Sequence, residues 1–466
     1  MPELPEVETV KRTLENLIIG KTISSIDVYR DKTLLNDKDE FVNGLIGATI
    51  TRMSRIGKFL IFHYDNNKVM VSHLRMEGKF FLKNASEKVS KHDLVCFNYT
   101  DGTSLRYNDT RRFGIIGLRN EDDYKTTDPV NKVGPEPFVV TEEHLIKAYK
   151  GKRIPMKSML LDQSIMSGLG NIYCDEVLFE THIHPETLAC DITPNQIKEI
   201  INASVKVLNH AIELGGSTIH SYQSAEGVNG EFQINLKAYG KDGTLCPNCN
   251  KETLRRIVVG GRGSTYCPNC QRNVSYPKVI GVTGPVGAGK STVSSLLAGS
   301  KYLLLDADKI VHELYSSSNF TKGMVKSLRL KDVTSNDIID RKLLREYLIA
   351  NPDKKAKLEK YVWDAVEDYI KSKLSKLKKD DVVILEVPML FESKLNYLCD
   401  KVVLVTASNE IQMKHLEKRG AATLDLMKIN KDYHLEEKLA KADYIIENNG
   451  SLKELKNKVS ELIKKF

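Results

Sequence analysis

The order of apolar and polar positions in the first 130 residues predicts one helix followed by short strands. The helix has a single apolar face, formed by Val7, Val10, Leu14, Leu17 and Ile18. Short apolar or alternating runs then follow between turns, at residues 23–30, 59–65, 69–74, 94–99, 104–108 and 114–119. We therefore expect a β-sandwich or barrel after one leading helix.

The pattern changes twice further along the chain. Residues from about 140 to 235 have mainly helical periodicity, which is clearest at 141–150, 171–180 and 194–214. From Lys278 onward, apolar strands alternate with helices; the predicted strands are 278–283, 302–306, 381–388 and 400–406. Such alternation is typical of a parallel α/β sheet. We expect four segments, at residues 1–130, 131–238, 239–275 and 278–466.

Length and composition agree with a multidomain globular protein. The chain has 466 residues, of which 41% are hydrophobic and 28% charged, which suggests about three structural units. No apolar stretch approaches the roughly 18 residues that a membrane span needs. The start has neither a basic cluster nor an apolar run, so we expect a cytoplasmic protein, without a membrane partner and monomeric.

The positive charge of the chain is concentrated locally. Residues 1–276 carry 35 Lys and Arg against 34 Asp and Glu, although the whole chain has a net charge of +8. Basic residues nevertheless cluster between 51 and 120, at Arg52, Arg55, Lys58, Arg75, Lys79, Arg106, Arg111 and Arg112. A local basic stripe is what binding to nucleic-acid phosphates requires, so we expect phosphate contacts there.

Four cysteines form a pattern typical of a metal site. Cys246, Cys249, Cys267 and Cys270 give two C-x2-C pairs separated by 17 residues. Four thiolates suit one tetrahedral, structural zinc ion, whereas two disulfides or a redox pair fit a cytoplasmic chain poorly. The segment between the pairs contains Gly-Gly-Arg-Gly, which places Arg262 on a turn, where an arginine can contact phosphate.

A second motif predicts a nucleotide site. Residues 284–292 read GPVGAGKST and follow the apolar strand at 278–283. In this context the pattern is a phosphate-binding loop: backbone N–H groups surround the ATP phosphates, Lys290 reaches the outer phosphates and Ser291 holds Mg²⁺. The predicted ATP-binding residues are Gly284, Pro285, Val286, Gly287, Ala288, Gly289, Lys290, Ser291 and Thr292.

The motifs of the first 275 residues resemble a known repair family. They are PELPEVET after Met1, GKFL at 57–60, HLRMEG at 73–78, YNDTRRFG at 107–114, GLGNIY at 168–173 and the four cysteines. Together and in this order they are similar to formamidopyrimidine-DNA glycosylase. The resemblance implies a β-sandwich, a helix–two-turns–helix domain and a zinc finger. It also implies excision of oxidised purines (8-oxoguanine and formamidopyrimidines) from double-stranded DNA, with AP lyase activity and β,δ-elimination.

The first residues fit that activity chemically. Loss of Met1 would leave Pro2 with a free secondary amine, and an α-amino group has a pKa about two units below that of lysine. Such an amine can attack the deoxyribose C1′ and form a cationic iminium, which favours elimination of the flanking phosphates. The resemblance gives Glu3 the role of proton donor and acceptor. Taken alone, Pro2-Glu3 would be read as a rigid, solvent-facing start.

The resemblance also implies roles for other residues. Lys58 would assist β-elimination, and Arg262 the final elimination. Met76, Arg111 and Phe113 would fill the space left by the flipped nucleotide. DNA contacts are implied for His92, Arg153, Lys157 and Asn171, and a loop at 215–233 would cover the extruded base.

Two features qualify this resemblance. Arg75 and Glu77 stand where small residues are expected, next to Met76. The sister family for oxidised pyrimidines is an alternative, but its start usually reads PEGPEI, whereas this chain reads PELPEV. The set of Met76, Arg111 and Phe113 also favours the purine enzyme.

The second half resembles dephospho-coenzyme A kinase. The phosphate-binding loop, DAD at 306–308, ILEVPMLFE at 384–392 and KADYIIENNG at 441–450 carry the resemblance, which covers about 278–466. It implies a P-loop α/β kinase that uses ATP and Mg²⁺ to phosphorylate the 3′-hydroxyl of dephospho-coenzyme A. Asp308 would act as the base, with Asp306 nearby.

This half also departs from the family pattern. Trp363-Asp364 replaces a common His-Pro, and the lid offers Arg419 but few further arginines. Three readings follow: a bifunctional enzyme, an active glycosylase with an inactive nucleotide-binding domain, or two folds that retain only the motifs.

Overall fold

The computed structural model describes residues 1–216, 232–417 and 434–466. The chain divides into two compact units, Met1–Asn273 and Val274–Phe466, and each is described by itself. Among the helices in the described ranges, none combines the length and the low charge content that crossing a bilayer requires.

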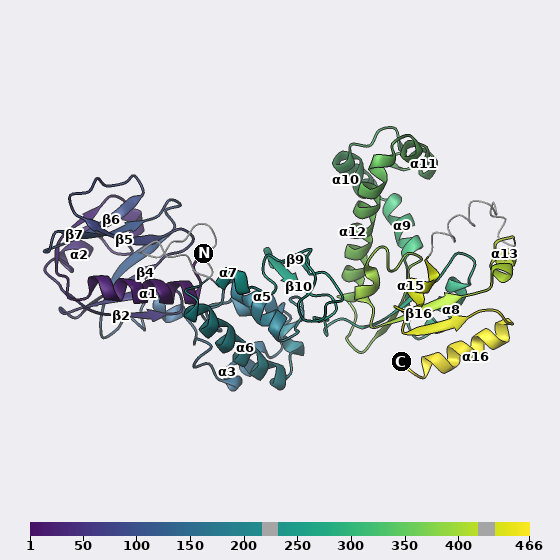
Figure 1. Ribbon diagram of the computed structural model, residues 1–466, viewed down its shortest axis with the longest axis horizontal. Helices are drawn as coiled ribbons and strands as arrows, with labels where there is room; N and C mark the ends of the chain where they lie inside the picture. The colour runs from purple at the N-terminus through teal and green to yellow at the C-terminus, as the bar shows by residue number, and fades with distance from the viewer. Residues whose placement is uncertain (217–231, 418–433) are drawn as a thin grey trace. The chain divides into compact units, whose positions relative to one another are not determined.

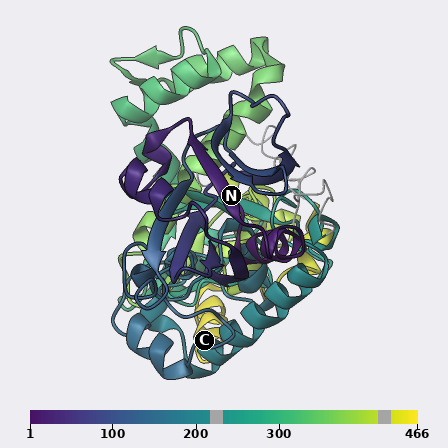
Figure 2. The same cartoon turned by 90° about the vertical axis from the view of Figure 1, so that its left-hand side faces the viewer.

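The first unit begins with helix α1 (Leu4–Ile18) and two antiparallel four-stranded sheets (Figure 1). One sheet has the order β2-β3-β4-β8 and the other β1-β6-β7-β5. The strands are β1 (Ile23–Val28), β2 (Ile50–Ile56), β3 (Phe59–Tyr64), β4 (Lys68–His73), β5 (Lys79–Asn84), β6 (Asp93–Tyr99), β7 (Thr103–Asn108) and β8 (Ile115–Asn120). A short helix, α2 (Lys38–Asn43), follows β1. This is the predicted β-sandwich with its leading helix. Figure 2 shows the helix α1 almost end-on.

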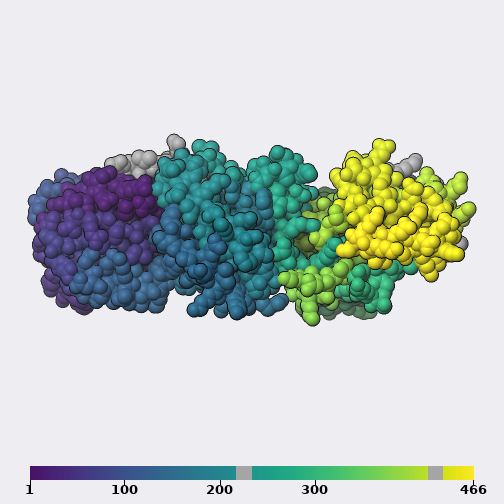
Figure 3. Space-filling view, turned by 90° about the horizontal axis from the view of Figure 1, so that it is seen from below, coloured from purple at the N-terminus to yellow at the C-terminus, as the bar shows by residue number. Residues whose placement is uncertain are grey.

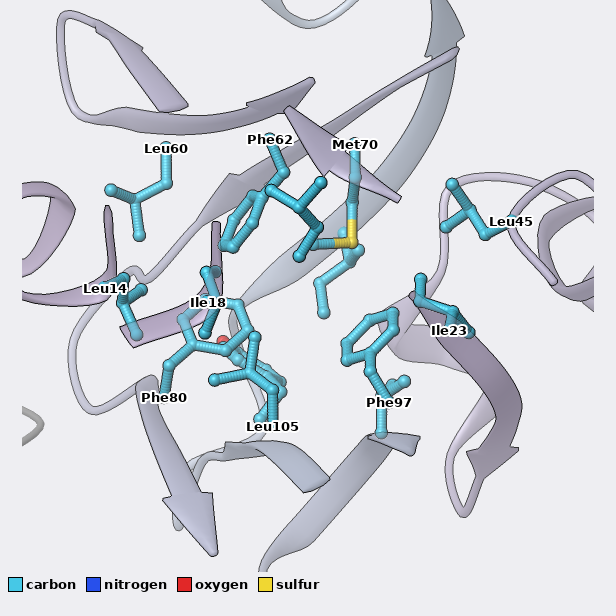
Figure 4. Packing of buried hydrophobic residues seen from close by; sticks show 14 of the residues in the cluster. Leu14, Ile18, Ile23, Leu45, Leu60, Phe62, Met70, Phe80, Phe97 and Leu105 are labelled. Carbon is cyan, nitrogen blue, oxygen red and sulfur yellow. The ribbon is translucent and has the colours of Figure 1, made fainter. Parts of the chain in front are cut away.

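Side chains from both sheets and from α1 form the core of the sandwich. Phe62 and Met70 from one sheet face Phe97 and Leu105 from the other, and Leu14 of α1 closes one side (Figure 4). The predicted apolar face of α1 is buried here, except that Leu17 is only partly covered. Leu4, in contrast, belongs to the core of the following helical part. The start of α1 therefore joins the β-sandwich to the helical part of this unit.

Helices and a small hairpin complete the first unit. The helices are α3 (Glu142–Tyr149), α4 (Met156–Leu161), α5 (Asn171–Glu180), α6 (Pro194–Glu213) and α7 (Phe232–Asn235). A capping box at Thr193, with Pro194 as the first helical residue, explains where α6 begins. Strands β9 (Arg255–Val259) and β10 (Arg262–Tyr266) pair in antiparallel fashion around the turn Gly260-Gly261.

The second unit contains a five-stranded parallel sheet of order β12-β15-β11-β16-β17. These strands are β11 (Lys278–Thr283), β12 (Leu303–Asp306), β15 (Val382–Glu386), β16 (Lys401–Thr406) and β17 (Tyr444–Glu447). A hairpin of β13 (Thr334–Ser335) and β14 (Ile338–Ile339) lies outside this sheet. The predicted parallel α/β sheet is confirmed, and its central strand β11 leads into the phosphate-binding loop.

Helices surround this sheet. They are α8 (Lys290–Ala298), α9 (Ala307–Tyr315), α10 (Ser318–Leu328), α11 (Arg341–Ala350), α12 (Lys355–Leu374), α13 (Asn409–Glu417), α15 (Leu435–Leu439) and α16 (Leu452–Ile463). Two apolar cores cover the sheet: one includes residues of α9 to α12, the other residues of α8 and α16. The C-terminal segment that contains α16 forms part of the surface of this unit (yellow in Figure 3).

Candidate active sites

The N-terminal residues lie inside the first unit. Pro2 and Glu3 are buried, whereas Met1 is 52% exposed. The backbone N–H of Leu4 donates a hydrogen bond to the carbonyl oxygen of Gly168 (3.1 Å), in the loop before α5. Pro5, in the first turn of α1, needs no hydrogen-bond acceptor for its nitrogen, which suits a helix that begins in a buried place.

The carboxylate of Glu3 is bound by the start of α5. Its two oxygens accept hydrogen bonds from the backbone N–H groups of Gly170 (2.6 Å), Ile172 (2.8 Å) and Tyr173 (3.3 Å). Unpaired N–H groups at a helix start favour negative charge. Burial nevertheless raises the pKa of Glu3 above its ordinary value, against the opposing charge of Lys58 and these hydrogen bonds. A buried carboxyl with a raised pKa can both give and take a proton near neutrality.

Glu6 holds Glu3 from the other side. One oxygen of the Glu6 carboxylate accepts the backbone N–H of Glu3 (2.8 Å), and the other accepts the hydroxyl of Tyr173 (2.6 Å). Glu3 and Glu6 also form a capping box at the start of α1. Glu6 and Tyr173 therefore fix the position of the catalytic candidate.

Two glycines make this close approach possible. A Cβ atom at Gly170 would lie 2.3 Å from Cδ of Glu3, and one at Gly168 would lie 2.5 Å from Cδ1 of Leu4. Gly168 also has a φ of +105°, which other residues rarely adopt. The GLG sequence at 168–170 is thus required for the N-terminal segment to reach α5.

Lys58 approaches the same loop from the sandwich. Its side-chain nitrogen donates a hydrogen bond to the carbonyl oxygen of Leu169 (2.6 Å), and the residue is only 4% exposed. Burial lowers the pKa of Lys58, although the charges of Glu3 and Glu6 act in the opposite direction. A lysine whose pKa is lowered is more readily deprotonated, as a general base must be.

The turn before Lys58 is fixed by an internal ion pair. The guanidinium of Arg55 donates two hydrogen bonds to the carboxylate of Glu136 (2.7 and 3.0 Å) and a third to Glu8 (3.1 Å). The Glu136 carboxylate also accepts the backbone N–H of Gly57 (2.7 Å). These bonds hold the β2–β3 turn and, through it, Lys58.

Two exposed loops carry the predicted wedge. The carboxylate of Asp109 accepts the backbone N–H groups of Arg111 (2.9 Å), Phe113 (2.9 Å) and Gly114 (2.8 Å). The loop therefore presents Phe113, which is 54% exposed, with the Arg111 guanidinium 5.1 Å from its ring centre. Met76, in the β4–β5 loop, is 38% exposed. Exposed apolar side chains, one of them beside an arginine, suit insertion between bases.

The four predicted cysteines converge. The sulfur atoms of Cys246, Cys249, Cys267 and Cys270 all lie within 4.8 Å of one another. Two of the separations are 3.7 and 3.9 Å, close to the distance of about 3.8 Å between thiolates that share a zinc ion through 2.3 Å bonds. The donor set fits one structural zinc ion, with no position left for a substrate. Arg262 begins β10 and is exposed.

The second unit has a P-loop between β11 and α8. Gly284, Gly287 and Gly289 have φ values of +156°, +83° and +93°, which allow a tightly curved loop. His415 bonds the carbonyl oxygen of Gly287 (2.8 Å), and the amide of Asn448 donates to that of Ala288 (3.0 Å). Two residues far along the chain therefore hold this loop.

Acidic residues lie at the ends of the neighbouring strands. The hydroxyl of Ser291 donates to Oε1 of Glu386 (2.7 Å), and Oε2 of this buried glutamate has no hydrogen-bond partner among the described residues. A hydroxyl and a carboxylate with a spare oxygen are ligands suited to Mg²⁺ or its waters. Asp308 follows β12; burial and the charge of Asp306 raise the pKa of its carboxyl, against the effects of Lys290 and Arg341.

Comparisons with known proteins agree with this geometry. A family model described as the formamidopyrimidine-DNA glycosylase N-terminal domain matches residues 1–116, and one described as the H2TH domain of the same family matches residues 133–223. The formamidopyrimidine-DNA glycosylase of Ligilactobacillus salivarius is 46% identical over 264 residues, which are 56% of this chain and 95% of that relative. The chain belongs to the formamidopyrimidine-DNA glycosylase family. A third model, described as dephospho-CoA kinase, matches residues 278–454, so a domain of that family follows the glycosylase part.

Further relatives give the same result for the glycosylase part. The formamidopyrimidine-DNA glycosylase of Exiguobacterium sibiricum is 47% identical over 268 residues, 95% of its length and 56% of this chain. Among solved structures, the Lactococcus lactis Fpg in complex with DNA containing an abasic site is 38% identical, with a TM-score of 0.55. MutM in complex with DNA containing carbocyclic 8-oxo-G is 37% identical, also with a TM-score of 0.55. Each covers 58% of this chain and 100% of the solved chain.

Within the glycosylase fold, most of the residues singled out from the sequence form two groups. Pro2, Glu3, Lys58 and Asn171 lie around the loop at 168–171. Met76, Arg111 and Phe113 lie on the two exposed loops. Arg153 is exposed, His92 is half-buried, and Arg262 lies on the hairpin.

Three members of the expected basic stripe, Arg55, Lys58 and Arg106, do not face solvent, so this part of the prediction is wrong; Lys58 is enclosed at the loop before α5, as described above. Arg106 is 1% exposed; its guanidinium donates to the carbonyl oxygens of Asn84, Glu87 and Lys88. Arg55 is engaged with Glu8 and Glu136, as described above. Charge counted along a strand does not reveal which arginines a neighbouring loop or carboxylate encloses.

Lys157 is also enclosed in this structure. Its side chain is 0% exposed, and its nitrogen donates to Asp175 (2.7 Å) and to the carbonyl oxygen of Asn171 (2.9 Å). Here its charge serves an internal ion pair, and a direct contact with DNA remains a prediction. The predicted cover at 215–233 falls mostly outside the described residues, as does Arg419 of the lid.

Several residues of these sites were missed from the sequence. Glu6 and Tyr173 belong to motifs that were recognised, but hydrogen-bond partners cannot be derived from a motif. Glu386 ends an apolar strand beside the P-loop strand, and a charged residue at such a strand end is a signal that points to a site. Nothing in the sequence indicated that His415 and Asn448 would bond the P-loop.

Proposed function

We propose that the first unit excises oxidised purines from duplex DNA and cleaves the strand with Pro2 as nucleophile. The observation that carries this proposal is the convergence of Pro2, Glu3 and Lys58 on one loop, with the Glu3 carboxylate accepting three N–H groups at the start of α5. Family membership gives the reaction class, and these contacts support the roles that we propose for residues of this chain. Met1, which is exposed, would first be removed to free the Pro2 nitrogen.

The first step is attack of the Pro2 amine on C1′. The nitrogen lone pair forms the N–C1′ bond while the glycosidic bond breaks. The electrons of the glycosidic bond leave with the base, which takes up a proton. The C1′–O4′ bond then opens: Glu3 gives a proton to O4′, and the nitrogen, after losing its own proton, becomes part of an iminium. The pKa of Glu3, which burial raises, suits this residue for the role of proton donor.

Two eliminations follow from the iminium. Loss of a C2′ proton breaks the C3′–O bond and releases the 3′ phosphate; loss of the C4′ proton then breaks the C5′–O bond and releases the 5′ phosphate. Lys58 is the candidate base for the first, since its lowered pKa favours the neutral amine. Arg262 is the candidate for the second, because a cation on the hairpin can stabilise the leaving phosphate. Hydrolysis of the iminium restores the free amine.

The wedge and the basic residues would hold the DNA. Met76 and Phe113 would enter the stack when the damaged nucleotide leaves it, and Arg111 would bond the unpaired cytosine. His92, Arg153 and Asn171 are candidates for contacts with the DNA backbone. The solved structures of related glycosylases are complexes with damaged or abasic DNA, which supports this partner.

We further propose that the second unit phosphorylates the 3′-hydroxyl of dephospho-coenzyme A. Lys290 and the P-loop N–H groups would bind the ATP phosphates, and Ser291 with Glu386 would hold Mg²⁺, which neutralises phosphate charge when bound. Asp308 would take the proton of the attacking hydroxyl as the new O–P bond forms and the bond to ADP breaks. A raised pKa suits Asp308 for that role.

An inactive kinase domain is the second candidate. Trp363 and Asp364 lie on α12, and the Asp364 carboxylate pairs with Lys360 (2.9 Å), where the family pattern commonly has His-Pro. Incubation with ATP, Mg²⁺ and dephospho-coenzyme A distinguishes the two. Formation of coenzyme A supports an active kinase, and ATP binding without turnover supports the alternative.

Borohydride trapping tests the glycosylase. We expect the full chain, with Met1 removed, to become covalently attached to a duplex with 8-oxoguanine opposite cytosine, because reduction fixes the iminium. The matched control duplex has an undamaged guanine and should give no adduct. Absence of any adduct on the damaged duplex would contradict the proposal.

A further inference from the structure

One buried carboxylate connects the β9–β10 hairpin, which lies between the two cysteine pairs, to the helices of the first unit. Oδ1 of Asp175 accepts hydrogen bonds from the Ser264 hydroxyl and the Lys157 ammonium, the latter at 2.7 Å. Oδ2 accepts the backbone N–H of Thr265 (2.9 Å). Asp175, Lys157 and Ser264 are all 0% exposed. Asp175 therefore joins α4, α5 and β10 at one point.

The hairpin side of this junction carries Arg262. Ser264 follows Arg262 by two positions in β10, so both side chains leave the same face of the strand. The strand pairs with β9 from Arg262 onward, and the turn before it contains only Gly260 and Gly261. A short turn leaves Arg262 little freedom relative to Ser264. The position of Ser264 thus determines where Arg262 is presented.

The helix side of the junction carries the N-terminal site. Glu3 is bound by the N–H groups of Ile172 and Tyr173, in the first turn of α5, and Asp175 is in the next turn. Lys157 bonds both turns, because it donates to Asp175 and to the carbonyl oxygen of Asn171. One helix start therefore holds Glu3 on one side and the Arg262 hairpin on the other.

We propose that Asp175 is a positioning residue that fixes Arg262 relative to Pro2 and Glu3, and that it controls the second elimination rather than base excision. The inference rests on the proposed lyase function. Base loss and the first elimination use Pro2, Glu3 and Lys58, whose contacts do not include the Asp175 side chain. The second elimination needs a group from the hairpin, which the Asp175–Ser264 contact holds in place.

The ion pair determines which substitution tests this cleanly. Removing one partner of a buried pair leaves a charge without compensation and destabilises the fold strongly. Asp175→Asn would leave Lys157 in that state, so this variant can fail to fold. Ser264→Ala leaves the pair intact and removes one charge-assisted hydrogen bond from the hairpin. Thr265→Val is the matched control, because it removes a neighbouring hydroxyl and keeps the N–H that Asp175 accepts.

The experiment uses the full chain with a 5′-labelled duplex that contains 8-oxoguanine. Single-turnover base excision, the borohydride adduct and the ratio of δ- to β-elimination product are measured for each variant. For Ser264→Ala we expect the product ratio to fall about tenfold, as loss of a charge-assisted hydrogen bond predicts. The rate of base excision and the yield of the borohydride adduct should stay within about twofold of those of the unmodified chain, because the substitution leaves Pro2 and Glu3 untouched. Thr265→Val should leave all three quantities unchanged.

Two results would overturn the inference. One is an unchanged product ratio in folded Ser264→Ala, and the other is a loss of excision equal to the loss of the second elimination, which would indicate a general structural role. Where Asp175→Asn folds, the same fall in ratio is expected, and an unchanged ratio counts against the inference. The adduct tests the proposed function, and the product ratio tests the role of Asp175. If the unmodified chain forms no adduct, the proposed function itself is contradicted.

Discussion

At the residue scale, the chemistry of the site depends on how polar groups are buried. Glu3 and Lys58 lie at the same loop, and burial shifts their pKa values in the directions that bring each closer to neutrality. The sequence predicted both residues, because they belong to a motif set. It did not predict Tyr173 or the N–H groups of α5 as partners of Glu6 and Glu3, since those contacts join segments about 170 positions apart.

A small substitution at Gly170 tests the approach of Glu3 to α5. Gly170→Ala would place a Cβ atom 2.3 Å from Cδ of Glu3, so we expect the carboxylate to be displaced and base excision to fall at least about 100-fold, as for loss of a general acid. Single-turnover excision measures this. Gly151→Ala is the control: its Cβ meets no atom within 4 Å, although its φ of +70° brings strain. Equal activities of the two variants would contradict the assignment.

His73 predicts a dependence of stability on pH. Burial, together with the charges of Arg75 and Lys58, lowers the pKa of His73 to about 3, from about 6.5 in the unfolded chain. The unfolded chain then binds one more proton between these values, so the free energy of unfolding should fall by about 1.4 kcal/mol for each pH unit below 6.5. In His73→Asn this part of the dependence should disappear.

Thermal unfolding at pH 7.5 and 5.5 measures the effect of His73. The substitution His73→Asn is chosen because the amide oxygen that it introduces can accept the backbone N–H of Arg75, which Nδ1 of His73 accepts at 3.0 Å. The single tryptophan, Trp363, belongs to the second unit, so its fluorescence provides an internal control that the substitution should not affect. The same shift in midpoint for His73→Asn and the unmodified chain would show that His73 is not the titrating group.

At the element scale, elements with a clear period or motif were predicted, and others were not. Six strands of the sandwich follow from alternation, and the P-loop follows from its motif. Strand β2 reads ITRMSRI, and its polar residues conceal the alternation. It forms because it pairs with β3 and packs against α1, which are contacts that a local pattern does not contain.

The four-cysteine cluster gives the prediction at this scale. Cys249→Ser removes one of four converging thiolates, so zinc affinity should fall by at least about 100-fold, because loss of an outer-shell partner alone typically costs about 10- to 100-fold. Elemental analysis should find one zinc ion in the unmodified chain and none in the variant. Cys190→Ser, at a partly exposed thiol outside the cluster, should keep its zinc. Full zinc content in Cys249→Ser would contradict the assignment of the ligands.

At the scale of the whole molecule, two units with separate cores share one chain. The glycosylase family accounts for the first unit, and the dephospho-CoA kinase family for most of the second. Both families were identifiable from the sequence, because their motifs are dense and in order. The enclosure of Arg55, Arg106 and Lys157 was not identifiable, because it depends on which loops and carboxylates fold over them.

Separate substitutions in the full chain test whether the two proposed activities are independent. Lys290→Ala removes the cation of the P-loop, so formation of coenzyme A should fall at least about 100-fold, while borohydride trapping stays unchanged. Pro2→Gly replaces the secondary α-amino group with a primary one. It should change the yield of the borohydride adduct and leave the formation of coenzyme A unchanged. Loss of both activities in either folded variant would contradict independence.

The identity of the trapped amino acid tests the central claim most directly. After borohydride reduction on the 8-oxoguanine duplex, proteolysis and mass spectrometry locate the residue that carries the sugar remnant. We expect a chain that lacks Met1 and is attached through the nitrogen of Pro2. Attachment at Lys58 or at any other amine, with Pro2 unmodified, would contradict it.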